Sequence, residues 1–135
     1  MDCIFCKIIE GEIPVKILKE TLNSISFLDA FPLAKGHVLV IPKNHHRKIQ
    51  DMSHEENTDL FSLVHLMISK VDEITGATLV AVHNGKDAGQ EVPHVHVHLV
   101  PRSADDSAGA IHSMFNPPLK LSESEIDELY NKLKI

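Results

Sequence analysis

Three histidines, His94, His96 and His98, alternate with apolar residues in the segment His-Val-His-Val-His-Leu-Val. Because successive side chains of a β-strand point to opposite faces, this alternation predicts a strand with all three imidazoles on one face and an apolar face in the core. Such a row of imidazoles has two chemical uses. A neutral imidazole can act as a nucleophile, with neighbouring groups as acid or base, and imidazole is also a common zinc ligand.

A pair of cysteines, Cys3 and Cys6, has the Cys-x-x-Cys spacing that suits two thiolates on one zinc ion. A structural zinc site takes four ligands, and the chain holds only 2 Cys, so imidazoles would have to supply the rest. A redox pair and two inert thiols are the competing interpretations. A redox pair normally follows a strand at the start of a helix, whereas this pair precedes every predicted strand, so zinc is favoured.

Short strands and two substantial helices must position these residues. Capping boxes at Ser53/Glu56 and Ser122/Glu125 each precede a series of apolar residues spaced by three and four, which predicts a helix after each box. A further short helical turn is expected over 5–9. Strands are expected at 15–19, 25–29, 37–41, 78–82 and 94–100. Strands in succession, joined by hairpin-like connections, indicate an α+β fold with an antiparallel sheet.

The composition excludes several classes of protein. The chain has 135 residues, enough for one domain, and a net charge of −6, which argues against general nucleic-acid binding. No apolar run approaches the roughly 20 residues of a membrane span, and the first residues lack the features of a secretory signal. We therefore expect a cytoplasmic protein with no membrane partner. The 10 His, nearly as many as the 13 Lys and Arg, are the unusual feature.

Four segments together resemble the histidine-triad (HIT) superfamily, in that superfamily's order and spacing. They are Phe27-Leu28-Asp29, Lys35-Gly36-His37-Val38-Leu39-Val40-Ile41-Pro42-Lys43, Gly89-Gln90-Glu91-Val92 and His94-Val95-His96-Val97-His98-Leu99-Val100. The match extends from about Cys3 to Arg102, so 1–135 is expected to be a single domain with a core over about 3–102 and an extension, 103–135, that ends in a helix. The resemblance implies a five-stranded antiparallel sheet with two main helices, usually in a homodimer.

The resemblance also implies a nucleotide-binding hydrolase or transferase that acts at the α-phosphate of nucleoside monophosphate conjugates. His96 matches the nucleophile, which would form a nucleotidyl-histidine intermediate, and His98 matches the residue that gives acid or electrostatic help. Asp29 matches the residue that accepts hydrogen bonds from the ribose. The expected base pocket comprises Ile4, Phe5, Phe27 and Leu39, and the expected phosphate loop comprises Asn84, Gly89, Gln90, Glu91 and Val92.

For the cysteine pair, the resemblance implies a structural zinc site formed by Cys3, Cys6, His45 and His94, with His46 as the alternative to His45. In that case His94 is structural and the catalytic face reduces to the other two histidines. No organic cofactor is expected. Among the remaining histidines, His37 is interpreted as structural, and no role is assigned to His83 or His112.

Several functions remain open from the sequence. The favoured one is hydrolysis of purine nucleoside phosphoramidates, with AMP or GMP as the nucleotide. The alternatives are a dinucleoside polyphosphate hydrolase, a nucleotide sensor with vestigial activity, and a metal-dependent hydrolase with zinc on all three histidines of the triad. Glu91 stands where several members have a small hydroxyl residue, which leaves the preferred leaving group open.

Overall fold

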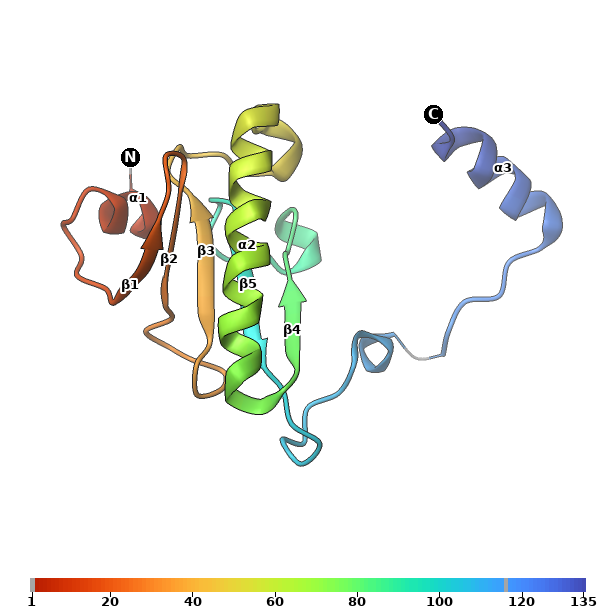
Figure 1. The fold of residues 1–135 in the computed structure, drawn as a ribbon. Coiled ribbons are helices and arrows are strands. Elements are labelled where there is room, and N and C mark those ends of the chain that lie inside the picture. Colours follow the sequence, from red (N-terminus) through yellow and green to blue (C-terminus); the bar gives the residue numbers. More distant parts are fainter. Residues whose placement is uncertain (1, 116) are drawn as a thin grey trace. The chain divides into compact units, whose positions relative to one another are not determined.

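Residues 2–115 and 117–135 are described by the computed structural model, which divides the chain into two units, up to Ala104 and Asp105–Ile135. The first unit is built on an antiparallel sheet of five strands in the order β1-β2-β3-β5-β4 (Figure 1). The strands are β1 (Ile17–Glu20), β2 (Ser24–Leu28), β3 (Val38–Pro42), β4 (Thr78–Ala81) and β5 (Val97–Pro101). The predicted α+β fold and antiparallel sheet are confirmed.

The long helix α2 (His54–Thr75) covers one face of the sheet (Figure 1). The predicted capping box is present, with Ser53 accepting from the Glu56 backbone N–H, and it contributes about 1 kcal/mol to helix stability. Gly76 ends the helix at φ 88°, a left-handed conformation that glycine adopts without steric cost. The apolar stripe of α2 packs on the strands. The core on this face comprises Val38, Val40, Met52, Leu60, Leu63, Val64, Met67, Val71, Val95, Val97 and Leu99.

The opposite face of the sheet packs against α1 (Ile4–Ile9), the short helix expected near the cysteines. The alternate residues of β3, Leu39 and Ile41, point to this face, where they meet Phe27, Phe5 and Ile8. Because β3 and β5 pair with Leu39 opposite His98 and Val40 opposite Val97, His98 of β5 shares the α1 face with Leu39. The strand alternation therefore separates a purely apolar core from a second face that can carry chemistry.

The histidine segment differs from the predicted strand in one respect, because β5 begins only at Val97. Before that point the chain pairs with the loop after β3, where the Val95 N–H donates to the His46 carbonyl oxygen at 2.8 Å. His94 and His96 nevertheless both contact the ring of Phe5, with centroid separations of 5.7 and 4.9 Å. The predicted common face thus extends beyond the ladder of β5.

Three short 3₁₀ turns that the sequence pattern did not predict are η1 (Ile49–Asp51), η2 (Lys86–Ala88) and η3 (Ile111–Met114). The second unit holds η3 and the helix α3 (Glu123–Leu133), whose predicted capping box of Ser122 and Glu125 is formed. Among the residues that the structure describes, no helix combines the length and apolar character needed to cross a membrane.

Candidate active site

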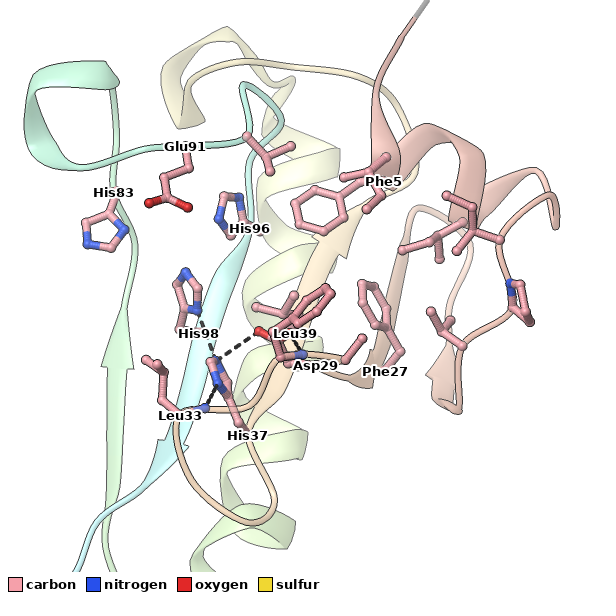
Figure 2. Close-up of a pocket in the computed structure, with 18 of the residues that line it drawn as sticks. Phe5, Phe27, Asp29, Leu33, His37, Leu39, His83, Glu91, His96 and His98 are labelled. Atoms are coloured by element: carbon pink, nitrogen blue, oxygen red, sulfur yellow. Dashed lines mark hydrogen bonds and ion pairs between the residues drawn. The ribbon is translucent and has the colours of Figure 1, made fainter. Parts of the chain in front are cut away.

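A pocket of about 680 Å³ lies on the α1 face of the sheet, between α1 and two histidines of the triad, His96 and His98. One end is apolar, with the rings of Phe5 and Phe27 beside Leu39, and the other end is polar, with His83 and Glu91 (Figure 2). Between the two ends lie the side chains that can take part in acid–base or nucleophilic chemistry: Asp29, His37, His96 and His98.

His96 is held with one ring nitrogen free for chemistry. Its Nδ1–H donates to the backbone carbonyl oxygen of His94 at 2.7 Å, so in the neutral ring the Nε2 atom keeps its lone pair. Only 8% of the residue is exposed, and burial lowers the pKa of His96 below its usual 6.5. The side chain is therefore neutral at pH 7, and it lines the pocket. A neutral imidazole with a free nitrogen is the form in which histidine acts as a nucleophile.

A chain of hydrogen bonds fixes the tautomer of His98. The backbone N–H of Leu33 donates to His37 Nδ1 at 3.0 Å, which leaves the proton of neutral His37 on Nε2. That Nε2–H donates to His98 Nδ1 at 3.0 Å, so the proton of neutral His98 lies on its own Nε2 (Figure 2). Burial and the neighbouring imidazoles lower the pKa of His98 to about 4, which keeps it neutral. His98 therefore offers an N–H donor, and the centroid of its ring lies 4.9 Å from that of the His96 ring.

Asp29 lies in the pocket wall next to this chain. Its Oδ1 accepts the backbone N–H of Phe31 at 2.8 Å, and its Oδ2 lies 3.6 Å from His37 Nε2. These contacts fix the carboxylate at the point where β2 leaves the sheet. Each oxygen keeps further acceptor capacity, as the expected role with ribose hydroxyls requires.

The loop expected to bind phosphate contributes only part of its residues to the pocket. Gly89, Glu91 and Val92 line it, but Asn84 and Gln90 are not among the described lining residues. The Asn84 side chain accepts the Ile49 N–H at 2.9 Å, and the Gln90 side chain accepts the Gly85 N–H at 2.9 Å. In the structure these two amides therefore shape the loop, and their predicted contact with phosphate stays a prediction.

His83, which received no role from the sequence, lies in the pocket wall directly before Asn84. Its ring stands 5.7 Å from that of His98. Gly89 packs closely on it at φ 108°, and a Cβ atom there would lie 3.1 Å from His83 Cδ2. The glycine is thus required both for its positive φ and for the close approach.

The four expected metal ligands come together at the N-terminal turn of α1. Cys3 Sγ lies 3.5 Å from His94 Nδ1, and Cys6 Sγ lies 3.4 Å from His45 Nδ1. The four ligand atoms all lie within 4.8 Å of one another. Such separations match those between neighbouring ligands of a tetrahedral zinc, whose bonds are about 2.0 to 2.3 Å long.

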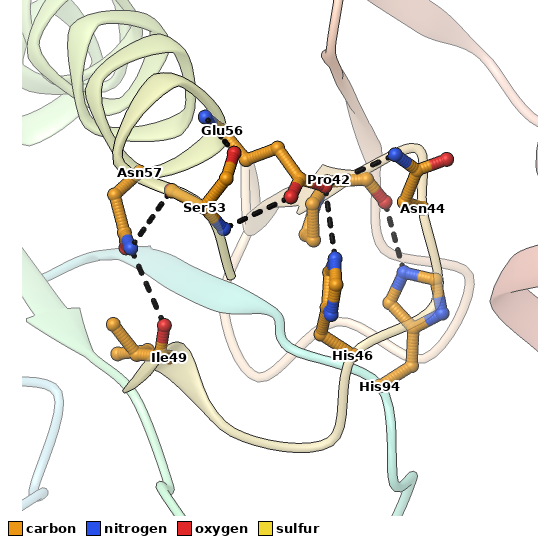
Figure 3. Close-up of polar contacts among 8 residues, drawn as sticks. All are labelled: Pro42, Asn44, His46, Ile49, Ser53, Glu56, Asn57 and His94. Carbon is orange, nitrogen blue, oxygen red and sulfur yellow. Dashed lines mark hydrogen bonds and ion pairs between the residues drawn. The ribbon is translucent and has the colours of Figure 1, made fainter. Parts of the chain in front are cut away.

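The protonation of this cluster also fits a metal. His94 Nε2–H donates to the Pro42 carbonyl oxygen at 2.9 Å, which leaves Nδ1 unprotonated toward the thiols (Figure 3). His46, the alternative ligand, is instead paired with Glu56 at 2.9 Å (Figure 3). Burial raises the pKa of the Cys6 thiol to about 11, so a bound cation is needed to hold it as a thiolate. Both cysteines are free thiols.

The histidines His94, His96 and His98 do not form a metal-binding group of their own among the described residues. Their ring nitrogens face different partners, because Nδ1 of His96 is bonded to a carbonyl oxygen and Nδ1 of His98 to His37. This arrangement gives no support to a metal-dependent hydrolase built on the triad. His94 instead groups with Cys3, Cys6 and His45, whereas His96 and His98 line the pocket.

Comparison with known proteins identifies the class that this fold and pocket define. Residues 10–105 match the HIT domain family, and the chain belongs to this family. It is 39% identical over 140 residues to adenosine 5′-monophosphoramidase of Schizosaccharomyces pombe. The alignment covers 99% of this chain and 100% of the relative.

Two solved structures are informative relatives. A histidine triad nucleotide-binding protein from Candida albicans superposes with a TM-score of 0.83 at 37% identity, covering 98% of this chain and 95% of the other. A Zn-bound histidine triad family protein from Mycobacterium smegmatis gives a TM-score of 0.68 at 34% identity, with 79% of each chain covered.

Proposed function

We propose that this protein is a hydrolase that cleaves purine nucleoside phosphoramidates at the α-phosphorus through a nucleotidyl-histidine intermediate on His96. The observation that carries the proposal is the orientation of His96, whose Nδ1–H is bonded to a backbone carbonyl while Nε2 is free in the pocket. The relative from S. pombe named as an adenosine 5′-monophosphoramidase supports the choice of substrate.

The reaction takes two steps. Nε2 of His96 attacks the α-phosphorus, and the bond from phosphorus to nitrogen breaks while that nitrogen, which has taken one proton from solution, leaves as an amine. The Nε2–H of His98 donates a hydrogen bond to the departing group or to a phosphoryl oxygen. Water then attacks the phosphorus, the bond to His96 breaks, and the nucleoside monophosphate leaves as one proton returns to solution.

The remaining site residues position the substrate in this proposal. The base lies against Ile4, Phe5, Phe27 and Leu39, and Asp29 accepts the ribose hydroxyls, which is consistent with their places in the pocket wall. The loop from Asn84 to Val92 lies beside the phosphoryl group. His37 acts through His98, since it fixes the tautomer that presents an N–H to the substrate.

Zinc has a structural part in this proposal. Cys3, Cys6, His45 and His94 would hold it, and the bound ion would tie α1 to the segment that carries His96. The Zn-bound relative from M. smegmatis supports this assignment. The chemistry at phosphorus uses only the two imidazoles of the pocket.

The intermediate provides the direct test. When the protein is mixed with adenosine 5′-phosphoramidate and unfolded within milliseconds, we expect a fraction of the chains to gain the mass of one adenylyl group at His96. The added mass should disappear as the substrate is consumed, because water completes the reaction. The covalent route would be contradicted if the phosphoramidate were consumed and no adenylylated chain appeared at any time. The comparison is made in a variant that hydrolyses the adenylylated chain slowly, because such a variant would accumulate this intermediate.

Comparison of the phosphoramidate with other nucleotides separates the alternative functions. A diadenosine polyphosphate hydrolysed faster than the phosphoramidate would indicate the polyphosphate hydrolase. Tight AMP binding without turnover of any conjugate would indicate a sensor. Neither alternative is favoured by a particular contact in the pocket.

We further propose that residues 1–135 form one HIT domain, with a core over about 3–102 and an extension over 103–135, that acts as a homodimer in the cytoplasm. The edge strand β4 exposes Leu79 and Val80, an apolar edge suited to pairing with a second copy. Two free thiols fit a reducing compartment. Light scattering should give twice the mass of one chain.

A further inference from the structure

The polar end of the pocket carries one carboxylate side chain, and no Lys or Arg is among the described residues of the pocket wall. Glu91 points into the pocket between His83 and His96, at the end away from Phe5 and Phe27 (Figure 2). If the base occupies the apolar end and the α-phosphorus lies at His96, the leaving group must extend toward this end. Glu91 is therefore placed to contact the leaving group and not the nucleoside.

The charges around the pocket are unusual for a site that would accept a polyphosphate. Its described lining residues include two carboxylates, Asp29 and Glu91, and no Lys or Arg. Asp29 already accepts a backbone N–H and faces His37. An anionic leaving group such as phosphate or sulfate is normally held by Arg, Lys or a metal ion, and at this end it would meet a carboxylate instead.

The loop that carries Glu91 is fixed from the side opposite the pocket. Gln90 Nε2 donates to the Arg47 carbonyl oxygen at 2.8 Å, and Asn84 Nδ2 donates to Gln50 Oε1 at 2.9 Å. Gly89 packs against His83. Glu91 thus directly follows an anchored residue, and its exposed side chain reaches the pocket from this position.

From these observations we propose that Glu91 determines leaving-group specificity, and that it favours conjugates whose leaving amine carries a further positive charge. The site would accordingly prefer nucleoside phosphoramidates of diamines, or of amines with a cationic side chain, over conjugates with phosphate, sulfate or carboxylate-bearing leaving groups. This inference rests on the proposed phosphoramidase activity. A unit charge a few ångströms from a carboxylate at a partly exposed site changes transition-state binding by roughly tenfold.

Three adenosine phosphoramidates of similar length test the proposal. Their leaving amines are 1,4-diaminobutane, which keeps a free ammonium, butylamine, which is uncharged, and 4-aminobutyrate, which is anionic. For the wild-type protein we expect kcat/KM to fall in that order, with a ratio of about 10 to 100 between cationic and anionic conjugates. In Glu91→Gln that ratio should fall by about tenfold.

Asp87→Asn is the matched control, because Asp87 lies in η2 of the same loop but not in the pocket wall, and the change in net charge is identical. Its ratio should equal that of the wild type. An unchanged ratio in Glu91→Gln, or equal turnover of all three conjugates by the wild type, would overturn the proposal. Absence of turnover even for the butylamine conjugate would instead contradict the phosphoramidase activity itself.

Discussion

Replacing His96 with Asn should reduce turnover of adenosine phosphoramidate by at least about 10³-fold. The amide N–H₂ of Asn can take the place of Nδ1 and preserve the hydrogen bond to the His94 carbonyl oxygen. The substitution therefore removes the nucleophilic Nε2 while it keeps the local backbone contact. Steady-state release of AMP, measured by chromatography, gives the rate, and AMP binding by calorimetry shows whether the pocket is intact.

A second histidine serves as the control. His65 is exposed on α2, on the far side of the sheet from the pocket, so His65→Asn should hydrolyse the substrate at the wild-type rate. The expected pattern is AMP binding by both variants and turnover by only one. Equal turnover by His96→Asn and the wild type would remove His96 from the reaction.

Replacing both Cys3 and Cys6 with Ser should lower the free energy of unfolding more than any other substitution proposed for this chain. The wild-type protein should contain about one zinc per chain by elemental analysis, and Cys3→Ser with Cys6→Ser should contain none. We expect the double variant to lose about 3 to 5 kcal/mol in the free energy of unfolding, because the cluster joins residues 91 positions apart and the metal binds only the folded chain. Denaturant unfolding measures this loss.

The neighbouring histidines 45 and 46 provide a matched pair for the same measurement. His45→Asn should lose zinc, since Nδ1 of His45 faces Cys6, whereas His46→Asn should retain it, since His46 is paired with Glu56. Zinc retained by the double cysteine variant, or absent from freshly purified wild type, would exclude the assignment. Zinc loss from His46→Asn alone would exchange the two ligand roles.

The pocket could be anticipated from the sequence only where spacing or resemblance points to a residue. Alternation predicts that His96 and His98 share a face, and the resemblance places Phe5 and Asp29 in the same pocket, where the structure finds them. The resemblance likewise groups Cys3 and Cys6 with His45, in preference to His46, and with His94, and the structure brings these four residues together. The positions of these residues could be anticipated because each depends on local periodicity or on a motif of several residues, and their roles in binding and catalysis stay predictions.

His37 and His83 show why the remainder required coordinates. His37 was interpreted as structural because it begins a buried strand, yet its Nε2 lies 3.0 Å from His98 Nδ1. His83 follows β4, and it reaches the pocket only because β4 pairs with β5. Neither pairing across the sheet nor the direction in which a loop amide turns, as at Asn84, is encoded in the spacing of residues along one segment.

The contacts of Phe5 have a consequence for the order in which the molecule folds. A helix as short as α1 does not persist alone in water, so it depends on the sheet beneath it. The ring of Phe5 packs on His94 and His96, which the ribosome adds long after Phe5. This part of the pocket wall is therefore synthesised first, and its packing is completed only once the histidine segment is present. The pocket of a nascent chain therefore stays incomplete until the histidine segment has emerged and packed against Phe5.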